Sequence, residues 1–294
     1  MKLLRAATLR VADPAATARR YVDWFDYGIV EEGAIDAMLA RSWGAPATHG
    51  RRYVVLQPAS GAGVYLRLVA GEPVAGYAPL RTFGWAAIEI CVRNVLAVNA
   101  RMRDSPFEII GPPREIEGLP AIFPMQVMGP DREVVYLTEI RSDLPSYDLP
   151  RAERLVDKAF ILVLGCSNLD ASIAWFERHV RLALGRRMDI VYTMLAKSFG
   201  LPQSELHTIA TVIHGRDVFL ELDQYPSAAM PRPRHDGDLP PGIAIGTLIQ
   251  PDFDLLPGPW IEEPRECSGA IYAGRRAGTM RAPDGTLLEI VAAL

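Results

Sequence analysis

The sequence has few cysteines and no long apolar run. Cys91, Cys166 and Cys267 lie far apart, and none belongs to a Cys-x-x-Cys pair. This spacing argues against a disulfide framework or a structural zinc site, and it favours a reducing, cytoplasmic location. The longest apolar run, Ala159–Cys166, is much shorter than the roughly 20 residues that a membrane-spanning helix needs. We therefore expect no membrane partner.

An excess of positive charge is also lacking. The chain has 31 Lys and Arg against 35 Asp and Glu, so its net charge is −4, and the two signs are interspersed along the sequence. Without a basic stripe to neutralise phosphates, nucleic-acid binding is not expected. Neither a Gly-x-Gly-x-x-Gly motif, a phosphate-binding loop nor a serine nucleophile motif is present, which removes support for nucleotide and serine-hydrolase chemistry.

The most informative feature that is present is an internal repeat. Met38–Pro46 recurs as Met194–Pro202, 156 residues later, and Pro130–Leu137 recurs as Pro283–Ile290 with an offset of 153. A repeat fixes architecture more firmly than local propensity does. With 294 residues, 49% of them hydrophobic, the chain is long enough for two domains. We predict one domain over residues 1–145 and a second over residues 155–294.

Each half predicts the same order of elements twice. In the first unit, a strand over Ala6–Val11 precedes a helix over Pro14–Tyr27, which Asp13 caps, and strands follow at Arg52–Gln57 and Gly63–Val69. Similar patterns start near residues 85, 159 and 243. The expected fold is therefore α+β, built from four tandem βαβββ modules that form curled mixed sheets.

Four such modules in two similar halves resemble the vicinal oxygen chelate superfamily of glyoxalases, extradiol dioxygenases and bleomycin-type resistance proteins. The most specific stretches are Ala282–Ile290, close to that family's closing PDGxxxEL segment, and Phe219–Leu222. The resemblance covers nearly the whole chain. It implies paired modules that curl around clefts, with divalent-metal ligands on the first and last strands of each module.

Strand alternation predicts which carboxylates face a cleft. Side chains two residues apart share one face of a strand, so Glu289 is expected to point inward, and Glu221 inward together with Phe219 and Asp223. Both glutamates are predicted to be catalytic in one downstream cleft, and to be ligands if a metal is bound.

The rest of the family's ligand set is missing. The resemblance puts the first-strand ligands near Ala6, Ala87, Ile161 and residues 243–245, all apolar, so its usual histidine ligands are absent. Two carboxylates alone do not hold a divalent ion with an open position. A metal cofactor therefore stays an open expectation, and an extradiol dioxygenase is the least favoured activity.

Five further residues are predicted to bind substrate. Arg67 and Tyr136 occupy the upstream positions that match the two glutamates, and they predict an anion or phenol site; alternatively, Arg67 pairs with an acid such as Glu89 and Tyr136 fills the cleft. Trp43 and Phe199, at equal places in the repeat, either cover a cleft or pack in the core.

His207 depends on the register of its hairpin. If the hairpin closes through Gly215 without a bulge, His207 lies on the face opposite Glu221, which argues against a role. A bulge or a longer turn would bring His207 to the same face as Glu221.

Two functions follow from this reading. The favoured one is an enzyme of the oxygen-chelate type that transfers a proton on a small oxygenated metabolite, aromatic metabolites included, as an isomerase or lyase. The alternative is a metal-free protein that binds or sequesters a small molecule. Because each pair of modules lies within one chain, a homodimer is compatible with the sequence but not required to complete a cleft.

Overall fold

The structure is a computed structural model that describes residues 2–293. Its first module contains β1 (Leu4–Val11), α1 (Pro14–Phe25), β2 (Tyr27–Ala34), α2 (Ala37–Ser42), η1 (Pro46–Thr48), β3 (Arg52–Pro58) and β4 (Tyr65–Ala70). The second contains β5 (Gly84–Val92), α3 (Val95–Met102), β6 (Glu108–Gly111), β7 (Ile122–Met128) and β8 (Val134–Ile140).

The second half repeats this order. The third module contains β9 (Val156–Cys166), α4 (Leu169–Val180), β10 (Ala183–Val191), α5 (Thr193–Phe199), β11 (Leu206–His214) and β12 (Asp217–Gln224). The fourth contains β13 (Gly242–Gln250), η2 (Phe253–Leu255), β14 (Arg265–Glu266), β15 (Arg276–Arg281), η3 (Pro283–Gly285) and β16 (Leu287–Ala292). A short 3-10 turn replaces the module's α-helix there, because Pro257 and Pro259 interrupt the segment.

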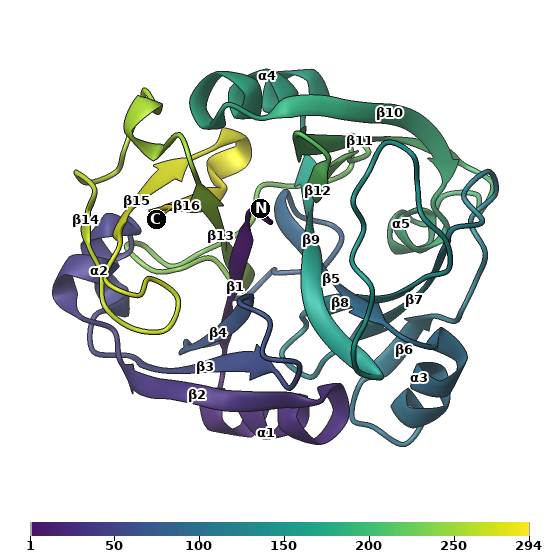
Figure 1. The fold of residues 1–294 in the computed structure, drawn as a ribbon, viewed down its shortest axis with the longest axis horizontal. Helices are drawn as coiled ribbons and strands as arrows, with labels where there is room; N and C mark the ends of the chain where they lie inside the picture. Colours follow the sequence, from purple (N-terminus) through teal and green to yellow (C-terminus); the bar gives the residue numbers. More distant parts are fainter. Residues whose placement is uncertain (1, 294) are drawn as a thin grey trace.

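The strands form two eight-stranded sheets, which curve side by side in Figure 1. The order in the first sheet is β14-β15-β16-β13-β1-β4-β3-β2, and in the second sheet it is β10-β11-β12-β9-β5-β8-β7-β6. The first sheet therefore joins modules one and four, and the second joins modules two and three. Neither half of the sequence forms a sheet of its own, so the domain boundaries at 1–145 and 155–294 remain a prediction about the repeat.

Local sequence explains how the modules begin. Asp13 caps α1 by accepting hydrogen bonds from the N–H groups of Ala15 (2.9 Å) and Ala16 (3.2 Å), and Asn168 caps α4 in the same way. Helix α1 buries Tyr21 and Phe25 against the outer face of the first sheet. The main core lies between the outer faces of the sheets and the helices α1, α3 and α4. The inner faces carry separate clusters, where the candidate sites lie.

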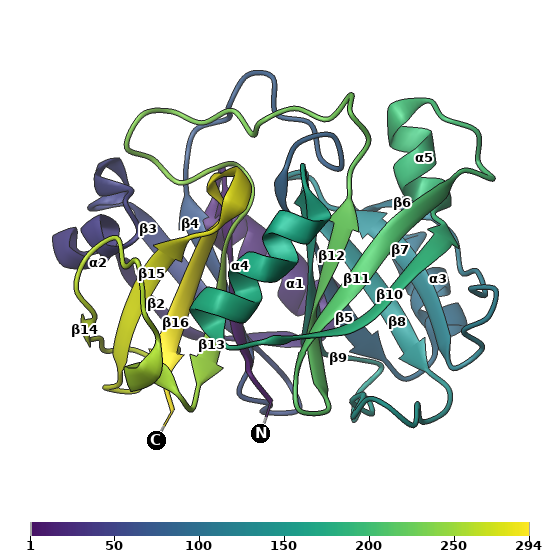
Figure 2. The same cartoon turned by 90° about the horizontal axis from the view of Figure 1, so that it is seen from above.

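Residues 225–241 connect the sheets by a long loop from β12 to β13, which Figure 2 shows crossing one edge of the molecule. Its anchor is the buried Asp238, whose Oδ2 accepts from Nη2 of both Arg10 and Arg51 at 2.9 Å. Oδ1 of Asp238 accepts from Thr48 Oγ1 at 3.1 Å. The loop is thus fixed to the first module. Among residues 2–293, no helix has the length and apolar character required to cross a membrane.

Candidate functional site

Four neighbouring strands at the centre of each sheet carry one inward side chain each, arranged as two directly paired residues on either side of the middle. In the first sheet, Thr8 pairs with Arg67 across β1 and β4, and Thr247 pairs with Glu289 across β13 and β16. The corresponding residues of the second sheet are Val163 beside Glu221 and Glu89 beside Tyr136. Glu289, Glu221, Arg67 and Tyr136 lie on the last strands of their modules, from which the resemblance implies metal ligands.

In the first sheet, the four residues form a closed network around Arg67. Its Nη2 lies 3.2 Å from Glu289 Oε2, its Nη1 donates to Tyr272 OH at 2.6 Å, and its Nε donates to Thr8 Oγ1 at 2.9 Å. The guanidinium also lies 4.4 Å from the Trp43 ring centroid, a cation-π contact. We call these residues, with Thr247, the Arg67 site.

Glu289 is fully occupied within this network. Oε1 accepts from Trp43 Nε1 at 2.8 Å and from Tyr272 OH at 2.7 Å, and Oε2 accepts from Arg67 and from Thr247 Oγ1 at 2.9 Å. The carboxylate is only 1% exposed. A carboxylate has about four lone-pair sites, so none is left for a metal ion or a substrate proton.

Burial and pairing set the ionisation of the network. Burial alone lowers the pKa of Arg67, but Tyr272 and Glu289 outweigh it and raise that pKa above its usual value. Burial raises the pKa of Tyr272 well above that of free tyrosine, although the neighbouring Arg67 opposes the change. Arg67 therefore stays charged, and Tyr272 stays a phenol.

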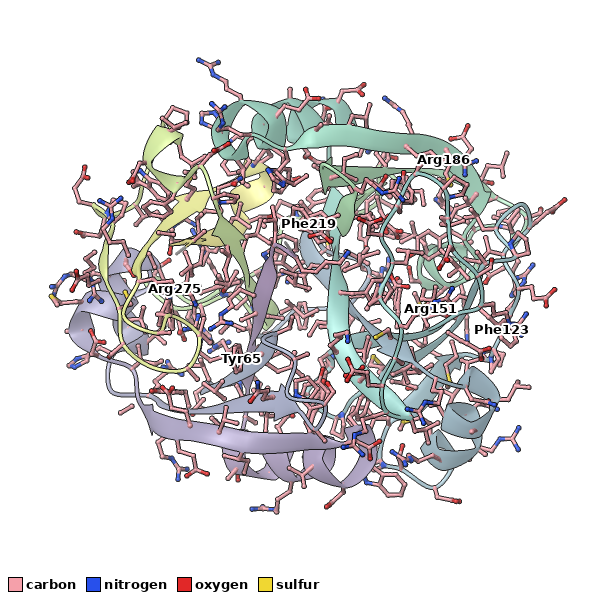
Figure 3. The ribbon with its side chains drawn as sticks, in the orientation of Figure 1. Tyr65, Phe123, Arg151, Arg186, Phe219 and Arg275 are labelled. Atoms are coloured by element: carbon pink, nitrogen blue, oxygen red, sulfur yellow. The ribbon has the colours of Figure 1, made fainter. Side chains whose placement is uncertain are left out.

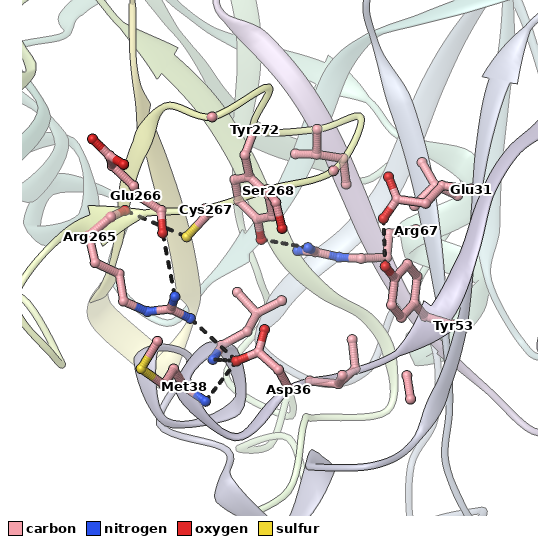
Figure 4. Close-up of a pocket in the computed structure, with 17 residues that line it drawn as sticks. Glu31, Asp36, Met38, Tyr53, Arg67, Arg265, Glu266, Cys267, Ser268 and Tyr272 are labelled. Atoms are coloured by element: carbon pink, nitrogen blue, oxygen red, sulfur yellow. Dashed lines mark hydrogen bonds and ion pairs between the residues drawn. The ribbon is translucent and has the colours of Figure 1, made fainter.

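A cavity of about 480 Å³ opens above the Arg67 site (Figure 4). Arg67 and Tyr272 lie at its floor, while Ile35, Leu39 and Val55 supply apolar wall. Residues 265–274 cover one side of it. This segment is fixed by Arg5, which donates from Nε to Ile271 O at 2.6 Å and from Nη2 to Ala270 O at 2.7 Å.

The second sheet holds a different cluster, which we call the Glu221 cluster. Tyr136 OH and Tyr192 OH form a hydrogen bond, and Thr138 Oγ1 donates to Glu89 Oε1 at 2.5 Å. Asp223 is 1% exposed, and its Oδ1 has no hydrogen-bond partner among residues 2–293.

The acids of this cluster hold protons unusually tightly. Burial, with a further contribution from Glu221, raises the pKa of Glu89 to about 8. Burial also raises the pKa of Asp223 to about 7, and burial together with Asp223 raises that of Glu221 well above its usual value. No arginine or lysine compensates these acids by an ion pair in the described part of the chain. Groups with such pKa values can exchange protons near neutral pH.

The predicted pairings of site residues are wrong in two respects. Glu289 and Glu221 do not share a cleft, because β16 belongs to the first sheet and β12 to the second. Arg67 and Tyr136 are separated for the same reason, and Arg67 pairs with Glu289 instead of Glu89. The structure brings together Arg67, Glu289 and Trp43 in one place, and Glu221, Tyr136 and His207 in another.

His207 reaches the Glu221 side because of a β-bulge. Ile213 pairs with Val218, but Val212 pairs with Leu220, so Phe219 is an extra residue on β12. Thr211 therefore faces Glu221, and His207 follows on the same face, where its ring lies 6.4 Å from that of Tyr192. The bulge also turns Phe219 into the core between the sheets, near the centre of Figure 3, which contradicts its predicted inward direction.

Trp43 and Phe199 occupy equal places in the repeat but different surroundings. Trp43 is fully buried in the Arg67 site. The half-buried Phe199 packs on Tyr225, with 6.0 Å between the ring centroids, and the Arg81 guanidinium lies 5.6 Å from its ring.

Thr8 and Thr247 were not expected at the site, and Glu89 was expected there only as a partner of Arg67. The expected first-strand positions Ala6 and Ile161 lie directly opposite Thr247 and Glu89. Tyr272 was missed because that residue lies outside the repeated segments.

The Arg67 site does not fit the divalent metal that the resemblance implies. The arginine occupies one of the four ligand positions, and every acceptor site of Glu289 is already used. Across residues 2–293, no three His, Cys, Asp or Glu side chains are grouped so that they could hold a metal ion. A divalent cation would have to displace a buried guanidinium from its carboxylate, which is strongly unfavourable.

Similar folds are found among solved structures. A variant of glyoxalase I from Zea mays is 17% identical with a TM-score of 0.65, and covers 98% of this chain and 93% of its own. The Zea mays enzyme itself is 17% identical with a TM-score of 0.63, covering 99% and 92%. A Bacillus subtilis protein provisionally assigned as a dioxygenase is 11% identical with a TM-score of 0.61, covering 99% and 86%.

No protein-family model matches the chain, and no curated protein matches its sequence. At these low identities, the similar structures show the fold alone. The predicted architecture is thus confirmed: the chain has an α+β, glyoxalase-like fold.

Proposed function

We propose that the chain binds a small oxygenated organic molecule in the cavity above the Arg67 site, and that the Arg67 guanidinium supplies the positive charge at its floor in place of a metal ion. The observation that carries this proposal is the buried Arg67–Glu289 pair beneath a cavity of about 480 Å³. A cavity of this size falls within the range of small-molecule sites.

Arg67 retains donors for a ligand. A guanidinium has five N–H groups, and three are used by Thr8, Tyr272 and Glu289. Two N–H groups are left for an oxygen acceptor at the cavity floor. The contacts to Trp43 and Glu289 hold the guanidinium in place, so little rotamer freedom is lost when a ligand binds.

Binding without a metal can be tested through Trp43, whose indole N–H donates to Glu289. Its indole NMR signal, assigned with a Trp43→Phe variant, should shift when small oxygenated compounds bind in the presence of EDTA. An Arg67→Lys variant should lose most of this response, because one ammonium cannot reproduce three directed N–H bonds. A stoichiometric metal whose removal abolishes binding would contradict the proposal.

The second candidate function is the proton-transfer enzyme, an isomerase or lyase, acting at the Glu221 cluster. The observation that favours it is the set of carboxyl pKa values near neutrality at Glu89 and Asp223. In this reading, Glu221 and its neighbours exchange a proton with a bound metabolite. Product analysis between pH 6 and 8 tests it: turnover that a Glu221→Gln variant abolishes supports the enzyme, and tight binding without turnover argues against it.

A further inference from the structure

A second, smaller cavity of about 220 Å³ lies at the seam between the two sheets. Its wall comes from the starts of β5 and β13, the turn before β16 and the loop over residues 225–241. Trp85 of the second sheet crosses the seam here, and its Nε1 donates to Leu287 O of the first sheet at 2.8 Å. The cavity shares no lining residue with the one above the Arg67 site. Since sites for larger metabolites measure about 300–1,000 Å³, this one suits a small ion or group.

Arginines without acidic partners gather at this cavity. Arg232 and Arg234 line it, and Arg281 Nη1 lies 3.5 Å from the carbonyl oxygen of Gly285 in its wall. Among residues 2–293, none of the three arginines forms an ion pair. Burial and the positive charge of Arg234 lower the pKa of Arg281, and no carboxylate of the described chain offsets this decrease. Arg234 and Arg281 are therefore close enough to repel each other.

The nearby acids do not cancel this positive charge. Asp284 lines the cavity, and its Oδ2 accepts from the Ser167 N–H at 2.9 Å. Asp236 belongs to the same loop as the arginines, but it is exposed and does not line the cavity. Asp238 is already paired with two arginines of the first module. Even if both Asp236 and Asp284 are counted against the three arginines, a positive charge remains.

Two donors in the cavity wall are buried without a hydrogen-bond partner. The Thr286 side chain is 5% exposed, and its Oγ1 has no partner among residues 2–293. The Nε–H of Arg232 is also buried and unpartnered. The rest of this guanidinium is fixed by carbonyl oxygens, because Nη1 donates to Ile243 at 2.9 Å and Nη2 to Trp85 at 2.7 Å. Unpaired buried donors are unfavourable, so these two groups indicate that an acceptor binds here.

From these observations, we infer that the cavity at the seam binds a small tetrahedral oxyanion, either phosphate itself or the phosphate group of an organic ester. Its oxygens would accept from Thr286 Oγ1 and Arg232 Nε, and the charges of Arg234 and Arg281 would balance that of the anion. A phosphate group presents oxygens in several directions, whereas a carboxylate presents two in one plane. Donors from two separate segments therefore fit phosphate better. Bound there, the anion would connect the loop over residues 225–241 to the turn before β16.

Inorganic phosphate is the first probe, and its affinity is measured by titration calorimetry in Tris chloride at constant ionic strength. We expect phosphate to bind at least tenfold more tightly than acetate, because it forms more charge-assisted hydrogen bonds. Glycerol 3-phosphate distinguishes the two sources of the group. Tighter binding of this ester than of phosphate supports an ester as the ligand, and the reverse order supports the free ion.

Matched variants locate the binding. Thr286→Val removes the unpartnered hydroxyl with little change in size, and should weaken phosphate binding about tenfold. Thr286→Ser keeps the hydroxyl and should bind phosphate within about twofold of the wild type. Arg234→Gln removes an exposed charge, and should weaken binding about threefold. Arg103→Gln removes an exposed arginine at the end of α3 that does not line the cavity, and should change nothing.

Thermal unfolding checks that the Thr286→Val variant is folded. Without phosphate, its Tm should equal or exceed that of the wild type, because the variant no longer buries an unpaired donor. Phosphate should raise the Tm of the wild type more than that of the variant.

Three results would overturn the inference. The first is that phosphate shows no binding in the calorimeter. The second is that Thr286→Val and Arg234→Gln bind phosphate as the wild type does, which would identify an adventitious ion only. The third is that acetate binds as tightly as phosphate, which would contradict a tetrahedral ligand.

Discussion

The four central positions correspond between the two sheets, but the two sheets bury charged groups there in different ways. The first sheet combines Arg67 and Glu289 with two threonines, so its buried acid is paired with a cation. The second combines Glu221 and Glu89 with a tyrosine and a valine, and its acids retain protons instead. One backbone arrangement thus supports two ways of avoiding an isolated buried charge.

The repeated segment packs differently beside the two inner faces. In the second sheet, Met194 and Leu195 of α5 are buried against the inner face. Their counterpart Met38 on α2 is 52% exposed and lies at the cavity wall. The first residue of the repeated segment is therefore exposed in one module and buried in the other. The difference favours the first sheet for ligand binding.

The largest effect on stability is expected when the Arg67–Glu289 ion pair of the first sheet is broken. Arg67→Met leaves Glu289 buried without its cation, and we expect the free energy of unfolding to fall by about 3–5 kcal/mol at pH 7. Urea denaturation followed by circular dichroism measures this change. Adding Glu289→Gln to the same chain should restore much of the loss. If Arg67→Met alone is as stable as the wild type, the ion pair with Arg67 does not stabilise the buried Glu289 carboxylate.

A smaller effect, which distinguishes the second sheet, is a dependence of stability on pH. The pKa of Glu89 is raised to about 8 in the folded state, so folding binds a proton that the unfolded chain releases above about pH 4.5. The contribution of this protonated Glu89 to stability is complete below about pH 4.5 and is lost as the pH rises towards 8. We expect the unfolding free energy to fall by about 1–2 kcal/mol between pH 6 and 8.

Glu89→Gln keeps an oxygen that accepts from Thr138 and removes the titration. Urea denaturation at pH 6 and pH 8 should therefore show a smaller decrease in this variant than in the wild type. Glu117→Gln, an exposed change in the same half of the chain, provides the control. Equal pH slopes for Glu89→Gln and the wild type would mean that Glu89 is ionised at both pH values.

Much of the architecture follows from the sequence because it depends on local periodicity. The predicted strand Arg52–Gln57 lies within β3, and the predicted helix Pro14–Tyr27 agrees with α1 to within two residues. Such patterns do not show which strands of different modules pair with each other. A strand buried on both faces has the same alternation whichever module it joins, so the sequence did not reveal that modules one and four share a sheet.

The candidate site was predictable only in part. Family-like segments identified Glu289 and Glu221, but the expected first-strand positions are apolar, so Thr8 and Thr247 were not expected at the site. The bulge at Phe219 changes which side chains of the hairpin face inward. A prediction that assumes a uniform hairpin register does not contain this bulge. Register and bulges depend on packing between distant segments, which the local pattern does not contain.

The smallest predicted effect compares Trp43 with Phe199 at matched repeat positions. Trp43→Phe removes a donor to Glu289 and weakens the stacking on Arg67, so we expect a loss of about 1–2 kcal/mol of unfolding free energy. Phe199→Leu trims a half-buried ring with no hydrogen bond, and about 1 kcal/mol or less should be lost. Urea denaturation of both variants at pH 7 measures the difference. If the two losses are equal, or if Phe199→Leu lowers the unfolding free energy more, the polar contacts of Trp43 do not add to stability. Trp43 would then contribute only through the burial of its ring.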